Sequence, residues 1–302
     1  MRRALAFAVT LWVALAAAPV WAAAANGGGL ALSAGSVLLL DADGKVLFAK
    51  NPSEDHAPAS LTKLMTLYLA YEDLEAGRVE WEEGVSVSRR AADTPRYRMG
   101  LRAGETVPLG TLLEGVAIAS ANDAAAAVAE HLAGSEEAFV HRMNDKAQGM
   151  GLAATRFANP HGLPDPLQRT TAQDMASLIG HLVTDYPASR TILGGKTFVF
   201  RGRVYARRIP LFDHPGGVQA LKTGFTNEAG YNLAIAAWRA GQRFLLIVLG
   251  SQTRSLSFRD ARKLLQYGFI ANGLDIGDDP PRRPAPPRRG PRRSNASVRS
   301  AG

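Results

Sequence analysis

The sequence contains no cysteine among its 302 residues. Disulfide bonds, thiol catalysis and metal sites built from thiolates are therefore excluded. The six histidines do not fall into a spacing typical of a zinc site, so we do not expect them to bind zinc. Long apolar runs are also missing beyond the N-terminus, since the stretch Phe244 to Gly250 is only strand-sized. We therefore expect no transmembrane segment in the mature chain.

Acidic residues are absent from Pro280–Gly302, which holds seven arginines. With Arg2 and Arg3 these supply nine positive charges, so a formal net charge of +8 leaves −1 for the rest of the chain. A near-neutral central part argues against nucleic acid as a partner. Two interpretations of the basic tail stay open: it contacts anionic wall polymers or lipid headgroups, or it is solvated and has no function.

The chain divides by composition into three parts. Met1-Arg2-Arg3 is followed by an apolar run to Trp21 and by Ala22–Ala25, which is typical of a secretory signal peptide cleaved near those alanines. We therefore predict a signal peptide over residues 1–25 and export to the periplasm or another extracytoplasmic space. Residues 26–275 are expected to form one folded domain. Residues 276–302 are rich in proline and arginine and are expected to be disordered.

Strand patterns lie at both ends of the folded part, and helical patterns fill its middle. Residues 36–50 read as a hairpin that turns at Asp43-Gly44, and residues 233–238 and 244–249 read as strands before a helix near 257–267. Between them, residues 108–151 are helix-rich, with a break at 120–122. This order predicts an α+β fold in which helices cover an antiparallel β-sheet and an all-helical subdomain adjoins it.

Ser60 and Lys63 form a Ser-x-x-Lys pair at the head of a predicted helix. Residues three apart on a helix share a face, so the hydroxyl and the amine can touch. A serine becomes a nucleophile when a neighbouring base takes its proton, and a lysine can be that base if its pKa is lowered. Taken alone, the pair arises often by chance on solvated helix faces.

Two further short motifs have structural as well as functional interpretations. Ser120-Ala121-Asn122 interrupts a helical run and, by itself, reads as a helix cap. Lys222-Thr223-Gly224 precedes a predicted strand and reads either as a turn at the strand end or as an edge where a ligand backbone approaches closely.

Together the three motifs form an ordered set, with 60 residues from Ser60 to Ser120 and 102 from Ser120 to Lys222. Such a set is found in penicillin-binding proteins and class A β-lactamases. The sequence resembles the low-molecular-mass penicillin-binding proteins, the D-alanyl-D-alanine carboxypeptidases, from about residue 36 to 269. The resemblance includes the stretches 120–125, 159–165 and 229–233. It implies a β-lactamase or DD-peptidase-like fold for the domain over residues 26–275.

The resemblance also implies catalytic roles. Ser60 would attack the carbonyl between two D-alanines, Lys63 would take its proton, and Ser120 would relay a proton to the departing D-alanine. The backbone N–H groups of Ser60 and Phe225 would form the oxyanion hole. Water would then release the acyl-enzyme, without a metal or cofactor.

Substrate-binding roles follow from the same resemblance. Asn122 would hold the peptide amide of the substrate, and Lys222 and Thr223 would receive its terminal carboxylate. Gly224 would let the substrate backbone lie beside the strand, as an added strand at the edge of the sheet. The expected partners are thus peptidoglycan stem peptides, with β-lactams as covalent inhibitors.

The sequence departs from the family pattern at three places. Phe225 stands where carboxypeptidases more often carry a polar residue, which also resembles the murein endopeptidases. Ser257 stands where an arginine often assists with the substrate carboxylate, with Arg254 or Arg259 as the substitutes. We expect neither the C-terminal β domain nor the amphipathic membrane anchor that many members carry.

A serine D-Ala-D-Ala carboxypeptidase acting on stem pentapeptides is therefore the favoured function, and a DD-endopeptidase of the same fold is the alternative. A class A β-lactamase is disfavoured, because residues 159–166 supply Asp165 and no glutamate for fast deacylation. A catalytically silent wall-binding protein is disfavoured by the intact motifs. The sequence leaves open the preferred third stem residue and the oligomeric state.

Overall fold

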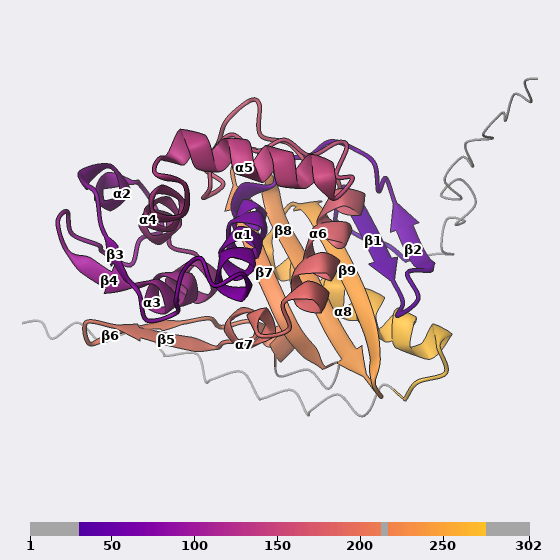
Figure 1. The fold of residues 1–302 in the computed structure, drawn as a ribbon. Helices are drawn as coiled ribbons and strands as arrows, with labels where there is room; N and C mark the ends of the chain where they lie inside the picture. The colour runs from indigo at the N-terminus through magenta and orange to yellow at the C-terminus, as the bar shows by residue number, and fades with distance from the viewer. Residues whose placement is uncertain (1–29, 213–216, 276–302) are drawn as a thin grey trace, which may run out of the picture.

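The computed structural model describes residues 30–212 and 217–275. The predicted signal peptide, residues 1–25, and the predicted tail, residues 276–302, lie outside the described residues. The described chain forms a five-stranded antiparallel sheet with helices on both faces (Figure 1). This confirms the predicted α+β class.

The central sheet takes its strands from both ends of the described chain. They are β1 (Ser36–Leu40), β2 (Val46–Lys50), β7 (Val218–Thr226), β8 (Gly230–Arg239) and β9 (Gln242–Ser251), in the spatial order β2-β1-β9-β8-β7. The predicted hairpin is confirmed as β1 and β2, with Leu40 paired to Val46. Lys222-Thr223-Gly224 lies within β7, so its reading as a strand-end turn was wrong. Because β7 is at the edge of the sheet, one side of its backbone is open to a partner.

Side chains of β9 alternate between two cores, as the pleat of a strand requires. Phe244, Leu246 and Val248 belong to the core under α8 (Arg254–Ala271). Leu245 and Ile247 point the other way, into the core that includes α6 (Ala172–Asp185) and the remaining helices. A strand buried on both faces explains why the sequence of β9 is apolar without interruption.

The helical region lies on the β7 side of the sheet (Figure 1). Its elements are α2 (Arg89–Asp93), α3 (Leu109–Glu114), η3 (Gly115–Ala119), α4 (Asn122–Ala133) and α5 (Glu136–Gly149). The short strands β3 (Gly84–Ser86) and β4 (Thr106–Pro108) pair within it. The prediction of an all-helical subdomain was therefore wrong in this detail. The remaining elements are α7 (Ser189–Leu193), the hairpin β5 (Thr197–Phe200) and β6 (Arg203–Ala206), and η4 (Pro210–Phe212).

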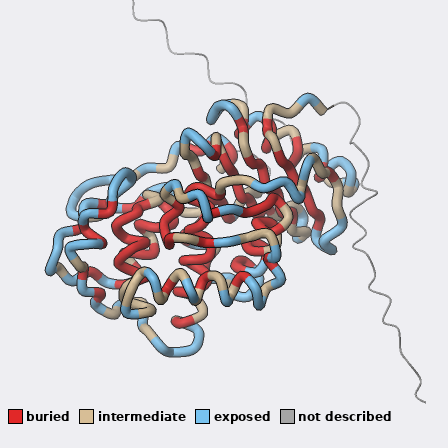
Figure 2. The backbone as a smooth tube through the Cα atoms, turned by 90° about the horizontal axis from the view of Figure 1, so that it is seen from above, coloured by how far each residue is buried: buried red, intermediate tan, exposed pale blue. Residues whose placement is uncertain are grey.

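Helix α1 (Lys63–Glu75) runs through the centre of the molecule and follows the short turn η2 (Ala59–Thr62). Every residue from Lys63 to Tyr71 is buried, because α4, α5 and α6 pack around the helix. Figure 2 shows buried backbone through the middle of the fold and exposed turns around it. A helix enclosed on all sides places even its first, charged residue in the core.

Within residues 30–212 and 217–275, no helix combines the length and hydropathy needed to cross a bilayer.

Candidate active site

Ser60 and Lys63 meet at the start of α1, as their spacing predicts. The Lys63 Nζ donates to the Ser60 Oγ at 3.2 Å and to the Asn122 Oδ1 at 2.7 Å. It also donates to the backbone carbonyl of His161. The chain enters η2 through Ala59, which has a left-handed φ of 50°. Such a backbone conformation is rare for alanine and persists where the surrounding structure imposes it.

Burial sets the charge of Lys63. The side chain is fully buried, and desolvation lowers its pKa to about 7, against the opposing effect of the Asp123 carboxylate. A large fraction of the amine is therefore neutral near pH 7, and a neutral amine in contact with Ser60 can accept the hydroxyl proton. The Asp123 carboxylate is held in place because it accepts from the backbone N–H groups of Met99, Gly100 and Leu101.

Ser120 faces the same centre from a strained turn. It follows the π-helical turn η3 and has a left-handed φ of 55°. The Lys222 Nζ, from β7, donates to the Ser120 Oγ at 2.8 Å. Burial, and then the nearby cations Lys63 and Arg207, lower the pKa of Lys222 well below its ordinary value. π-helical turns cost stability and often mark functional positions.

Glycines allow the backbone around Ser60 to pack closely. A Cβ on Gly224 would lie 3.0 Å from the Pro58 carbonyl oxygen and 3.1 Å from the Ser60 nitrogen, so glycine lets edge strand β7 approach the serine without displacing these atoms. On the opposite side, a Cβ on Gly162 would lie 2.0 Å from the Ala59 carbonyl oxygen. The Ser60 turn is therefore held between β7 and the loop at residues 159–166.

A pocket of about 400 Å³ opens onto these residues. Five of the eight predicted site residues line it, namely Ser60, Ser120, Thr223, Gly224 and Phe225. The other three are at most 2% exposed and lie behind its wall, namely Lys63, Asn122 and Lys222. The structure therefore brings all eight together, but only the first group faces the space where a ligand would bind.

A match to a family model shows the family to which the chain belongs. Residues 22–253, more than half of the chain, match the model of Peptidase S11, D-alanyl-D-alanine carboxypeptidase. The chain belongs to this family.

Individual relatives agree with this membership. The D-alanyl-D-alanine carboxypeptidase DacC of Escherichia coli is 40% identical over 77% of this chain and 60% of its own length. Penicillin-binding protein 5 from Haemophilus influenzae superposes with a TM-score of 0.78 at 35% identity, covering 80% of this chain and 72% of that one. Penicillin-binding protein D2 from Listeria monocytogenes, solved in a cefotaxime-bound form, gives 0.73 at 29% identity, covering 80% and 99%.

This chain spans about 60% of the length of the first curated relatives that it matches. A D-alanyl-D-alanine endopeptidase of Pseudomonas aeruginosa is 30% identical over 88% of this chain and 89% of its own length.

Asn232 positions the segment that leads into Ser60, and sequence reasoning missed this contact. Its Nδ2 donates to the carbonyls of Ala57 and Pro58, and its Oδ1 accepts from the Gly250 N–H. It therefore ties the segment before Ser60 to the sheet. The only sequence signal was its place in the stretch 229–233.

Asn122 makes contacts different from the predicted one. Its Nδ2 donates to the Pro95 carbonyl, its backbone N–H donates to the Tyr97 carbonyl, and its Oδ1 accepts from Lys63. The side chain therefore links Lys63 to the segment that carries Tyr97, a pocket-lining residue that the sequence did not indicate. Contact with a substrate amide stays a prediction.

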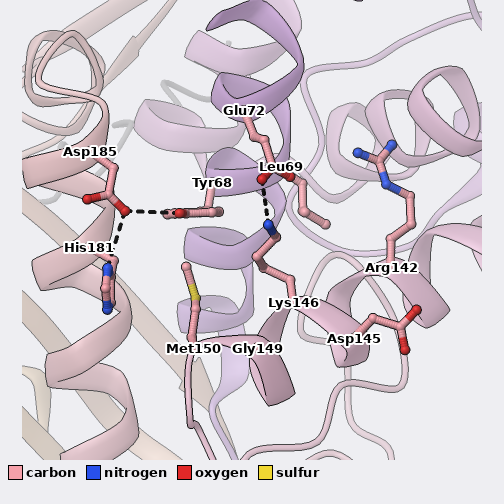
Figure 3. Close-up of a pocket in the computed structure, with 10 residues that line it drawn as sticks. All are labelled: Tyr68, Leu69, Glu72, Arg142, Asp145, Lys146, Gly149, Met150, His181 and Asp185. Carbon is pink, nitrogen blue, oxygen red and sulfur yellow. Dashed lines mark hydrogen bonds and ion pairs between the residues drawn. The ribbon is translucent and has the colours of Figure 1, made fainter. Parts of the chain in front are cut away.

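A larger hollow of about 600 Å³ lies along the far part of α1 (Figure 3) and contains none of the predicted site residues. Two polar pairs lie in it: Lys146 contacts Glu72 at 2.5 Å, and the Tyr68 hydroxyl donates to Asp185 at 2.9 Å. His181 also contacts Asp185 at 3.2 Å. Because no serine, threonine or cysteine is among the residues that line this hollow, we place the candidate active site in the smaller pocket, which Ser60 lines.

Proposed function

We propose that the protein is a serine D-Ala-D-Ala carboxypeptidase that removes the terminal D-alanine from peptidoglycan stem pentapeptides. One observation carries the proposal: a pocket-lining serine contacts a buried lysine whose pKa is about 7. Membership of Peptidase S11 and the carboxypeptidase relatives support it.

In the acylation step, the Ser60 Oγ attacks the carbonyl carbon of the scissile D-Ala-D-Ala bond while Lys63 takes the hydroxyl proton. The backbone N–H groups of Ser60 and Phe225 stabilise the negative charge that develops on the carbonyl oxygen. The closeness of β7 to the Ser60 backbone, which Gly224 permits, supports this pairing of donors.

Ser120 then passes a proton to the nitrogen of the departing D-alanine. The hydrogen bond from Lys222 fixes its hydroxyl, and the Asn122 contact fixes Lys63 across from it. The substrate backbone lies beside the open edge of β7 as an added strand, with Thr223 and Phe225 in the pocket wall. Water hydrolyses the acyl-enzyme and restores Ser60.

We propose that β-lactams acylate the same serine. The cefotaxime-bound form of the Listeria monocytogenes relative supports this. The loop at 159–166 supplies no glutamate to activate a deacylating water. We therefore expect a long-lived penicilloyl-enzyme, and turnover of penicillin at many molecules per second would contradict the proposal.

Export to the cell-wall compartment is part of the proposal. The signal-peptide pattern in residues 1–25 supports it, as does the carboxypeptidase activity named for the relatives. The arginine-rich tail keeps its two interpretations, contact with an anionic surface or solvation.

A DD-endopeptidase that cuts peptide cross-links is the second candidate. The Pseudomonas aeruginosa relative favours it, as does the aromatic pair of Phe225 and Tyr231 in the pocket wall, with ring centroids 4.3 Å apart.

The deciding experiment incubates the mature protein with a disaccharide pentapeptide and, separately, with a cross-linked muropeptide dimer, and follows products by mass spectrometry. Loss of one D-alanine with the dimer intact is the expected result. Faster splitting of the dimer would establish the endopeptidase instead. Cleavage of neither substrate would reject both.

A further inference from the structure

A groove of about 460 Å³ lies between the end of α1, the end of α3 and helix α7 (Figure 1), and it shares no lining residue with the Ser60 pocket. Three aromatic side chains stand in a row along it. The ring centre of Tyr71 lies 6.3 Å from that of Trp81 and 6.2 Å from that of Tyr186. Tyr71 is buried, whereas the outer two are partly exposed, so the row offers ring surface to an incoming group. We call this site the aromatic groove.

Two carboxylates also line the aromatic groove, and no lysine, arginine or histidine is among the described residues that line it. Glu75 lies one turn after Tyr71 on α1, so the two side chains share a face of the helix. Burial, and then the Glu114 carboxylate at the end of α3, raise the pKa of the Tyr71 hydroxyl, which shows that Glu114 is close to that ring.

The two carboxylates of the aromatic groove are available to a partner. Within residues 30–212 and 217–275, neither Glu75 nor Glu114 forms an ion pair. Aromatic faces attract cations, and carboxylates form charge-assisted hydrogen bonds with them. The aromatic groove therefore has the chemistry of a site for a cationic, partly apolar segment.

The hollow of Figure 3 differs from the aromatic groove in this respect. Arg142 and Lys146 line the hollow, and they already pair with Asp73 and Glu72. A positively charged partner would meet these cations there, whereas the lining of the aromatic groove has none among the described residues. Charge thus favours the groove over the larger hollow for such a partner.

Residues 280–293 of the same chain have the complementary composition. They include six arginines, six prolines and no acidic residue. Pro281, Pro284 and Pro287 repeat the Pro-x-x-Pro spacing of segments that bind aromatic-lined grooves, where the fixed φ of proline lowers the entropy lost on binding. Arginines beside these prolines add planar donors that match a carboxylate.

The length of the chain after α8 suits this contact. Arg293 lies 18 residues beyond Asp275, the last described residue. An extended segment of that length spans up to about 60 Å. A domain of this size has a radius of gyration of about 18 Å and hence a diameter of about 45 Å. The chain is therefore long enough to bring the arginines of this segment to the groove.

We propose that residues 280–293 dock in the aromatic groove of their own chain, where their arginines pair with Glu75 and Glu114 and their prolines pack on Trp81 and Tyr186. This gives the basic tail a third interpretation, in which its charge is held by the protein itself. Because the groove and the Ser60 pocket share no lining residue, docking is independent of the proposed function.

The test uses the full mature chain, which has no cysteine, so that Ser294→Cys carries a single nitroxide spin label beside the docking segment. Paramagnetic broadening of the backbone amide NMR signals shows which surface lies near the label. We expect broadening at residues of the groove such as Leu74 and Ala188, and less at Gly149 in the hollow of Figure 3. High salt should weaken it, because partly exposed ion pairs are screened.

The decisive variant combines Glu75→Gln with Glu114→Gln and so removes both charges from the groove. The ratio of docked to free segment should fall about 2- to 30-fold, the effect of losing two partly exposed ion pairs. The matched control combines Glu80→Gln with Glu82→Gln, two exposed glutamates that do not line the groove, and should keep the broadening. Acylation by benzylpenicillin at the wild-type rate checks that both double variants are folded.

Three outcomes would overturn the inference. The first is broadening spread evenly over the surface, and the second is broadening that the loss of Glu75 and Glu114 leaves unchanged. The third comes from a mixture of isotope-labelled protein without the spin label and spin-labelled protein without the isotope. Broadening of the groove in this mixture as strong as within one chain would mean that the tail of a second copy binds there.

Discussion

Helix α1 carries charged side chains near both of its ends, and the two ends arrange them differently. At the start, Lys63 lies in a buried centre that also contains Lys222, with the carboxylate of Asp123 nearby. Toward the end, Asp73 bonds Arg142 at 2.8 Å. Glu72 bonds Lys146 at 2.5 Å, the pair drawn in Figure 3. The first end keeps like charges together, whereas the second pairs opposite ones.

Under the proposed function, this difference separates the part of the helix that takes part in the reaction, the reactive end, from the part that holds it in place, the anchoring end. Burial lowers the pKa of both lysines, and nearby cations lower that of Lys222 further. Stability alone does not require such lowered pKa values, but proton transfer does. The opposite charges at the other end link α1 to α5. The Glu72–Lys146 pair is partly exposed and contributes little stability, whereas Asp73 is buried against Arg142. Four predictions test whether the two ends of α1 have these different roles, beginning with the largest expected effect.

Replacing Ser60 by Ala removes the nucleophile at the reactive end. We expect acylation by a fluorescent penicillin to fall at least about 10⁴-fold, as when the serine of a hydrolase is removed. The measurement is the yield of labelled protein in a gel, with intact mass as a check. Labelling that persists on another residue would show that Ser60 is not the acylated serine.

Gly162→Ala tests the backbone that holds Ser60. The added Cβ would lie 2.0 Å from the Ala59 carbonyl oxygen at a φ of 86°, so the nucleophile must move. A displacement of this size is expected to lower the acylation rate constant by about 10²-fold.

Gly151→Ala is the matched control for this change. Gly151 also has a left-handed φ, 73°, but nothing lies within 4 Å of its Cβ position. Both variants should lose about 1–2 kcal/mol from the backbone conformation alone. Equal acylation rates in the two would show that contact with Ala59 is unimportant.

The pH dependence of acylation tests the lowered pKa of Lys63. The amine must be unprotonated to accept the serine proton, so the rate constant should rise about tenfold per pH unit below pH 7 and level off above it. Asp123 opposes the lowering, while burial lowers the pKa of His161 to about 3 and so keeps this neighbour neutral across the range. Stopped-flow acylation between pH 5 and 9.5 gives the curve. A rate constant that still rises about tenfold per pH unit at pH 9 would mean that Lys63 is not desolvated.

Lys146→Met breaks a pair at the anchoring end. The partners are about a quarter exposed, so the free energy of unfolding should fall by no more than about 1 kcal/mol, and less at high salt. Acylation should stay within about 2-fold of wild type, because the pair lies outside the Ser60 pocket. Urea unfolding and acylation rates check both statements, and a tenfold slower acylation would show that the two ends are coupled.

Local patterns predicted much of the fold. The hairpin at 36–50, the break at 120–122 and the strand at 244–249 depend on neighbours in the chain, and all three are confirmed. The local pattern did not distinguish an edge strand from a turn at Lys222-Thr223-Gly224, because both are compatible with a short segment that contains glycine.

The sequence by itself determined that Ser60 touches Lys63, because residues three apart at a helix start share a face. It also identified the residues of the three motifs, since their types and order are read directly. Only the tertiary structure decided which of them face the pocket: Thr223 does, Lys222 does not, and Arg254 joins from α8. It also decided the pKa of Lys63, because desolvation depends on the helices packed around α1, and no single segment of the chain contains that environment.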